Sequence, residues 1–108
     1  MNASNPNLKF EYLYRDGGNY KTWGEIIFEN PSGLNTEEAT EKVRKLLISS
    51  EFFNPKIAGI ERFDSLIFDP ELDHEWYEFD QVSETSEEVT SHFSFDQFLK
   101  NWSASLPR

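Results

Sequence analysis

Cysteine is absent from this chain of 108 residues, and histidine occurs only twice. The lack of cysteine excludes disulfide bonds, thiolate catalysis and zinc sites with cysteine ligands. No apolar run approaches the roughly 20 residues that a membrane-spanning helix needs. Residues 1–7 lack the basic and apolar regions of a signal peptide. We therefore expect a flexible leader over residues 1–7, a single domain over residues 8–108, and a cytoplasmic protein.

The chain also lacks the sequence patterns of common catalytic sites. It contains no glycine-rich phosphate loop and no serine in a nucleophile elbow. A pair of carboxylates could act in general acid catalysis, but acids are so plentiful here that no particular pair stands out. We predict no catalytic residue, no cofactor and no dedicated metal site, and we do not expect an enzyme.

Positive charge is scarce, with 10 basic residues against 20 acidic ones and a net charge of −10. The excess of acid lies in one region, because residues 61–88 hold eleven acids and the single Arg62. Such a field repels nucleic acid and anionic membranes and favours cationic partners. We therefore expect neither direct nucleic-acid binding nor membrane binding. The simplest interpretation is a solvated acidic face that keeps a small protein soluble.

Two alternating runs surround a glycine-containing turn near the N-terminus. Apolar and polar residues alternate over 8–15 and again over 20–29, which is typical of half-buried strands. A loop of odd length keeps the inner residues of both strands on one face, whereas a slip of one residue would reverse every side chain. The sequence thus predicts a β-hairpin in which Tyr14 faces Tyr20.

Helices and a later strand follow the hairpin. Asn35 with Glu38, and Ser94 with Gln97, have the spacing of capping boxes at the starts of amphipathic helices. Residues 73–82 alternate like a further strand. This pattern predicts an α+β fold with a mainly antiparallel sheet, formed by the N-terminal hairpin and later strands, and two amphipathic helices packed on one face.

The sheet face that points away from the helices is the first candidate site. Two tryptophans are unexpected on a solvated face, and tryptophan is favoured at binding hot spots. An apolar patch rimmed by acids suits a basic protein partner or a second copy of the chain, as in an inhibitor, immunity or anti-defence protein. The alternative is that other segments cover this face and form a second small core. The predicted partner-binding residues are Trp23, Ile27, Trp76, Glu78 and Asp80.

A small-molecule or metal-binding site is the alternative function. Arginine provides a fixed-charge fork for a carboxylate or phosphate, and a histidine among carboxylates can bind a divalent ion. Alternation sends His74 and Glu75 to opposite faces, however, which leaves a metal site incomplete. Asp and Asn beside two glycines are also ordinary turn residues. The residues of this alternative site are Tyr14, Arg15, Asp16, Asn19, Lys21, Asp73 and His74.

The hairpin motif Tyr-Arg-Asp, two residues, then Asn-Tyr-Lys at residues 14–21 resembles small bacterial and phage-type proteins of no known activity. In those proteins a helix, a Phe-x-Pro-like corner and a strand containing Asp-His follow the hairpin. The segments Phe53-Asn54-Pro55 and Asp73-His74 are similar here. The resemblance covers most of the chain and implies a fold and a bacterial or viral origin, but no activity, cofactor or catalytic residue.

Overall fold

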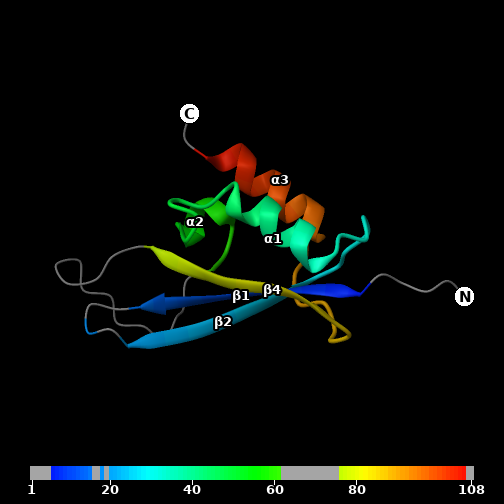
Figure 1. The fold of residues 1–108 in the computed structure, drawn as a ribbon, viewed down its shortest axis with the longest axis horizontal. Coiled ribbons are helices and arrows are strands. Elements are labelled where there is room, and N and C mark those ends of the chain that lie inside the picture. The colour runs from blue at the N-terminus through cyan, green and yellow to red at the C-terminus, as the bar shows by residue number, and fades with distance from the viewer. Residues whose placement is uncertain (1–5, 16–17, 19, 62–75, 107–108) are drawn as a thin grey trace, which may run out of the picture.

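The computed structural model describes residues 6–15, 18, 20–61 and 76–106. Four antiparallel strands form one sheet in the order β2-β1-β4-β3, and three helices accompany it. Figure 1 shows the helices above a curled sheet. The α+β class is confirmed, with three described helices where the sequence predicted two. The elements are β1 (Asn7–Arg15), β2 (Lys21–Phe28), α1 (Thr36–Arg44), β3 (Phe52–Phe53), α2 (Pro55–Ala58), β4 (Tyr77–Thr85) and α3 (Phe95–Ser105).

The hairpin between β1 and β2 forms, but its register differs by two residues from the predicted one. Tyr14 faces Thr22 rather than Tyr20, and at the other end of the hairpin Leu8 faces Phe28. The observed register buries Leu8 and Phe28 together, so the core decides the pairing and the turn sequence does not. A shift of two residues leaves every side chain on its predicted face.

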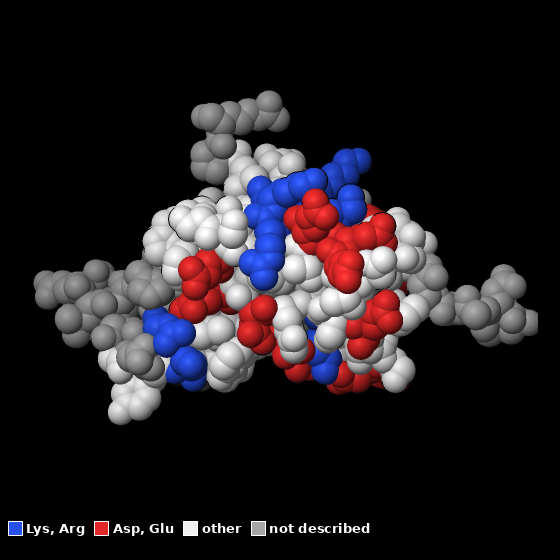
Figure 2. Space-filling view, in the orientation of Figure 1, with Lys and Arg blue, Asp and Glu red and all other residues white. Residues whose placement is uncertain are grey.

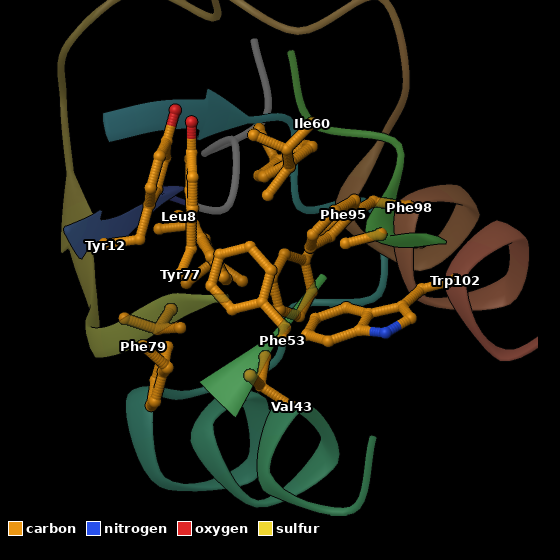
Figure 3. Packing of buried hydrophobic residues seen from close by; sticks show 14 of the residues in the cluster. Leu8, Tyr12, Val43, Phe53, Ile60, Tyr77, Phe79, Phe95, Phe98 and Trp102 are labelled. Atoms are coloured by element: carbon orange, nitrogen blue, oxygen red, sulfur yellow. The ribbon is translucent and has the colours of Figure 1, made fainter. Parts of the chain in front are cut away.

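The core lies on the inner face of the sheet, beneath the helices. Every second residue of β1 is buried there, from Leu8 through Phe10 and Tyr12 to Tyr14. The ring of Phe10 lies 5.4 Å from that of Phe98 in α3, with edge-to-face geometry. Figure 3 shows Phe98 and Trp102 of α3 with Val43 of α1, and all three belong to the same cluster as Phe10. Aromatic packing therefore joins the helices to the central strand.

A β-bulge keeps β4 in phase with this core. Glu11 faces Gln81 while Tyr12 faces Phe79, so Asp80 is an extra residue on β4. Without a bulge, strict alternation from the buried Phe79 would turn Val82 outward. Because of it, Val82 is also buried. The bulge consequently brings Asp80 and Gln81 together on the outer face.

The predicted starts of two helices are confirmed. The side chain of Asn35 accepts a hydrogen bond from the backbone of Glu38, and the Glu38 side chain accepts one from Asn35, which completes the capping box of α1. Ser94 caps α3 by accepting from the backbone N–H of Gln97. The side chain of Gln97 bonds to Asn101 instead of closing a box. None of the described helices has the length and apolar character required to cross a membrane.

The segment after β4 returns along the edge of β2. The backbone N–H groups of Thr90 and Ser91 both donate to the carbonyl of Ile27, and the N–H of Ile27 donates to Oγ1 of Thr90. Earlier in this segment, Glu87 forms an ion pair with Lys9 on the outer face of β1. One end of the outer face and one half of the β2 edge are therefore covered by the chain itself.

Deleting Asp80 tests the role of the bulge. The deletion removes the extra residue but leaves Tyr77, Phe79 and Val82 inward, so we expect a folded protein that loses less than about 2 kcal/mol of its free energy of unfolding. One serine inserted between Tyr77 and Glu78 is the matched control, since it turns Tyr77 out of the core and should prevent folding. Urea denaturation measures both. Equal losses in the two variants would contradict the assignment.

The phenol of Tyr12 makes stability depend on alkaline pH. Burial, assisted by Tyr77 and Glu61, raises the pKa of Tyr12 from 10.0 to about 12. The unfolded chain therefore loses this proton first, and stability present below pH 10 is lost as pH rises through this window. One pKa unit corresponds to about 1.4 kcal/mol, so the loss is about 2 kcal/mol at pH 12 and approaches about 3 kcal/mol only at higher pH. In urea denaturation at increasing pH, Tyr12→Phe should lose less free energy of unfolding than wild type by this amount. If both proteins lost stability equally, the phenol of Tyr12 would not be the cause.

Candidate functional site

The outer face of the sheet near the hairpin turn carries the candidate site. The registers place Trp23 of β2, Leu13 of β1 and Glu78 of β4 in one row across three strands. The next row toward the middle of the sheet contains Glu25 and Glu11, with the bulge beside them. We call this region the hairpin-end surface and define it by Trp23, Trp76, Glu78, Glu11, Glu25 and Asp80.

Both tryptophans of this surface are accessible. Trp23 is 56% exposed, and Trp76, which directly precedes β4, is 40% exposed. In contrast, Trp102 of α3 is 1% exposed and belongs to the core. Leu13 lies beside Trp23 and is buried, yet it is not part of the main core cluster. The outer face therefore has an apolar centre of its own, and both indole rings are partly exposed to solvent.

An ion pair lies next to the tryptophans. Nε of Arg15 donates to one carboxylate oxygen of Glu78 at 2.9 Å, and a terminal nitrogen of Arg15 donates to the other at 3.3 Å. The hydrogen bond with Glu78 is the main cause that raises the pKa of Arg15. The Glu78 side chain is only 13% exposed. This forked contact holds Glu78 in place and occupies the guanidinium that the alternative site would have offered to a ligand.

Two carboxylates face each other in the next row, and a third lies one residue from this row on β4. Glu11 faces Glu25 directly across the hairpin, and on its other side it faces Gln81, which follows the bulge residue Asp80. Like charges that face each other across strands destabilise a sheet. The only described hydrogen bond that relieves Glu11 comes from Nε2 of Gln81, at 3.3 Å. Lys9 on the same face interacts with Glu25 and Glu11 and offsets part of their repulsion. The pair of acids nevertheless lies one row from an exposed tryptophan.

The structure removes one residue from each predicted site, because Ile27 and Tyr14 are both buried. Ile27 is on the predicted face but is 3% exposed, so its side chain is not available to a partner; its backbone is hydrogen-bonded to Thr90. Tyr14 is also 3% exposed, and its ring lies in the core, 5.2 Å from that of Tyr77. The remaining predicted partner residues, Trp23, Trp76, Glu78 and Asp80, lie in the hairpin-end surface.

Of the described residues of the alternative ligand site, Arg15 and Lys21 come together and Tyr14 does not join them. Tyr14 faces the core, whereas Arg15 and Lys21 face each other on the opposite side of the sheet. Asp16, Asn19, Asp73 and His74 lie outside the described residues. Within the part of the chain that the structure describes, no group of three or more histidine, aspartate or glutamate side chains is arranged to hold a metal ion.

Two features of this region were not predicted from the sequence. The acidic character was predicted for residues 61–88, but Glu11 and Glu25 of the hairpin also face each other on the outer face. Their proximity depends on the register of the hairpin, which no local pattern reveals. A groove of about 390 Å³ on the other side of the sheet, lined partly by Tyr12, His92 and Phe93, was also missed.

The side of the molecule that carries α1 shows no comparable excess of charge of one sign among its described residues. Figure 2 shows acidic and basic side chains next to one another over this helix. The composition of α1 agrees, because Glu37, Glu38 and Glu41 alternate with Lys42 and Arg44. Charges of opposite sign at such spacing largely cancel. Of the two regions, the hairpin-end surface is the better candidate for binding a partner of one charge.

Comparison with known proteins found no matching family model, no matching curated protein and no matching solved structure. The resemblance of residues 14–21 to small bacterial and phage-type proteins therefore stays a prediction.

Replacing Glu11 by glutamine tests the acidic row. We expect Glu11→Gln to raise the free energy of unfolding by about 0.2–1 kcal/mol at neutral pH and low ionic strength, because it removes repulsion from Glu25 and Asp80. The gain should shrink at high salt. Glu84→Gln is the matched control, since Glu84 faces Leu8 and not another acid. Denaturation of all three proteins is the measurement, and an equal gain in the control would contradict the pairing.

Proposed function

We propose that this chain is a non-catalytic interaction protein that presents its acidic, tryptophan-bearing hairpin-end surface to a basic protein partner. A second copy of the chain is the other partner that such a surface can accept. An inhibitor, immunity or anti-defence role fits this description. The observation that carries the proposal is Trp23, an indole ring that is 56% exposed on the face that also holds the Glu11–Glu25 pair.

The chemistry of this surface suits a cationic side chain. An arginine or lysine over the face of a tryptophan gains about 0.5–2 kcal/mol from the ring quadrupole. Trp23 and Glu25 are two positions apart on β2, so they share a face about 7 Å apart along the strand. A partner's guanidinium or ammonium group can therefore contact the ring and the Glu11–Glu25 carboxylates together. Such binding would also remove the repulsion between the two acids.

The charge of the whole chain supports the same class of partner. With a net charge of −10, the protein attracts a basic molecule over a distance and repels nucleic acid and anionic lipid. Steering of this kind accelerates association and weakens as salt increases. The described part of the acidic region lies partly on this surface, where β4 contributes Glu78 and Asp80. Local and long-range charge thus favour a basic partner.

A selection from a random peptide library, with the protein immobilised at low salt, tests the proposal. We expect enriched peptides to contain arginine or lysine. Trp23→Ala should weaken their binding by about tenfold to a hundredfold, the cost of removing a hot-spot residue. Glu11→Gln combined with Glu25→Gln should weaken it as well. Fluorescence anisotropy of a labelled, enriched peptide measures each affinity, and added salt should lower the affinity for wild type.

Phe93→Ala is the matched control, because Phe93 is 53% exposed and lies outside the hairpin-end surface. It should bind the selected peptide as wild type does. The proposal would be contradicted if the selection enriched no basic sequences, or if Trp23→Ala and Phe93→Ala bound the peptide equally well. A melting screen against metals, nucleotides and metabolites addresses the alternative: a ligand that stabilises wild type but not Arg15→Ala would favour a small-molecule site.

A further inference from the structure

The free edge of the sheet belongs to β2, which is the outermost strand of the described sheet next to β1. Both backbone groups of Ile27 point away from β1, because its N–H donates to Thr90 Oγ1 and its carbonyl accepts from Thr90 and Ser91. Backbone groups along a strand alternate in direction, so those of Lys21, Trp23 and Glu25 point to the same edge.

The residues that the structure describes cover one half of this edge. At one end Thr90 and Ser91 bind Ile27, and the N–H of Phe95 donates to the carbonyl of Glu29. Among the described residues, none forms a backbone hydrogen bond with the outward groups of Lys21, Trp23 or Glu25, and all three side chains are exposed. An open strand edge is a template for another strand.

We infer that a second copy of this chain pairs with that edge. In this arrangement β2 of each copy runs antiparallel to the other around a two-fold axis at Trp23, and the two four-stranded sheets become one. Trp23 then faces Trp23 of the second copy, and Lys21 faces Glu25 of the second copy on both sides of the axis. A two-fold contact of this kind uses the same patch on both molecules and closes on itself.

Three features of β2 select this register. Lys21, Trp23 and Glu25 all direct their backbone groups to the edge, so each facing pair exchanges two hydrogen bonds, about six in total. Opposite charges and paired aromatic rings stabilise facing positions across strands. A shift of two residues in either direction places Trp23 opposite Lys21 or Glu25 and loses the complementary charge pairs. Odd shifts mismatch the hydrogen-bonding groups.

The net charge of the chain determines how this dimer should respond to salt. Two copies of −10 repel each other, so screening should strengthen the dimer, whereas binding to a basic partner should weaken. The contact area of a five-residue edge is small, which predicts a weak dimer with a dissociation constant on the micromolar scale. The inference goes beyond the proposed function and does not require a basic partner to exist.

Two single charge reversals test the pairing. Lys21→Glu places two glutamates opposite each other across the interface, and Glu25→Lys places two lysines opposite each other, so each variant alone should dimerise at least about tenfold more weakly than wild type. A mixture of the two variants restores both opposite-charge pairs and should form heterodimers. Neither change should destabilise the monomer, because each replaces a like-charge pair by an opposite-charge pair. Lys21→Glu places a glutamate opposite Arg15, and Glu25→Lys places a lysine opposite Glu11.

Sedimentation equilibrium of each protein, and of the equimolar mixture, is the measurement. The expected result is a wild-type dimer that salt strengthens, weakened association in each variant, and recovery in the mixture to near the wild-type constant. A wild-type chain that stays monomeric at about 1 mM would overturn the inference, as would a dimer that neither reversal weakens or a mixture that does not recover. Peptide binding by monomers at low concentration is measured separately, so the two proposals fail independently.

Discussion

The central position of β1 is the constraint on which the remaining structure depends. This strand pairs with β2 on one side and with β4 on the other, so it cannot shift without disturbing both neighbours. Its inward residues meet the aromatic rings of β4 and α3 in one cluster. In Figure 3 the rings of Tyr12 and Tyr77 lie side by side, 5.9 Å apart and nearly parallel. Packing on one face therefore fixes which residues appear on the other.

This constraint also determines which residues point to the outer face. Because the inner face must bury Phe10 and Tyr12, the residues between and beside them, Glu11 and Leu13, must point outward. The bulge in β4 then adds Asp80 to the same side. The segment that holds Glu87 and Thr90 is bonded to Lys9 and to the backbone of Ile27 at the far end of this face. Among the described residues, the exposed part is the hairpin-end surface, where Trp23 lies between the Glu11–Glu25 pair and the Arg15–Lys21 pair.

Local patterns in the sequence were sufficient for some of these features. Alternation in the first strand identified the faces of Tyr12 and Leu13, and the capping residues Asn35 and Ser94 marked two helix starts. Such signals are local, because a strand's period and a helix cap are set by neighbouring residues. The fold class followed from them, although the short helix α2 was not anticipated.

The features that could not be predicted from the sequence depend on contacts between distant segments. The hairpin register is decided by Leu8 against Phe28, far from the turn, and the covering of Ile27 by Thr90 joins residues that are 63 positions apart. The facing of Glu11 and Glu25 follows from that register. A local pattern carries no information about such pairs, so the site could be predicted only as a face and its members only in part.

Quenching of a single tryptophan tests the account most directly. In a variant with Trp76→Phe and Trp102→Phe, only Trp23 emits. Its ring lies between Lys21 and Glu25, so the net charge of −10 and the Glu11–Glu25 pair decide the local field, and they predict more efficient quenching by caesium than by iodide at equal ionic strength. A companion variant that retains only Trp102 should be shielded from both ions. If the Trp23 variant were shielded as well, or were quenched more by iodide than by caesium, the outer face would not be the open acidic surface described above.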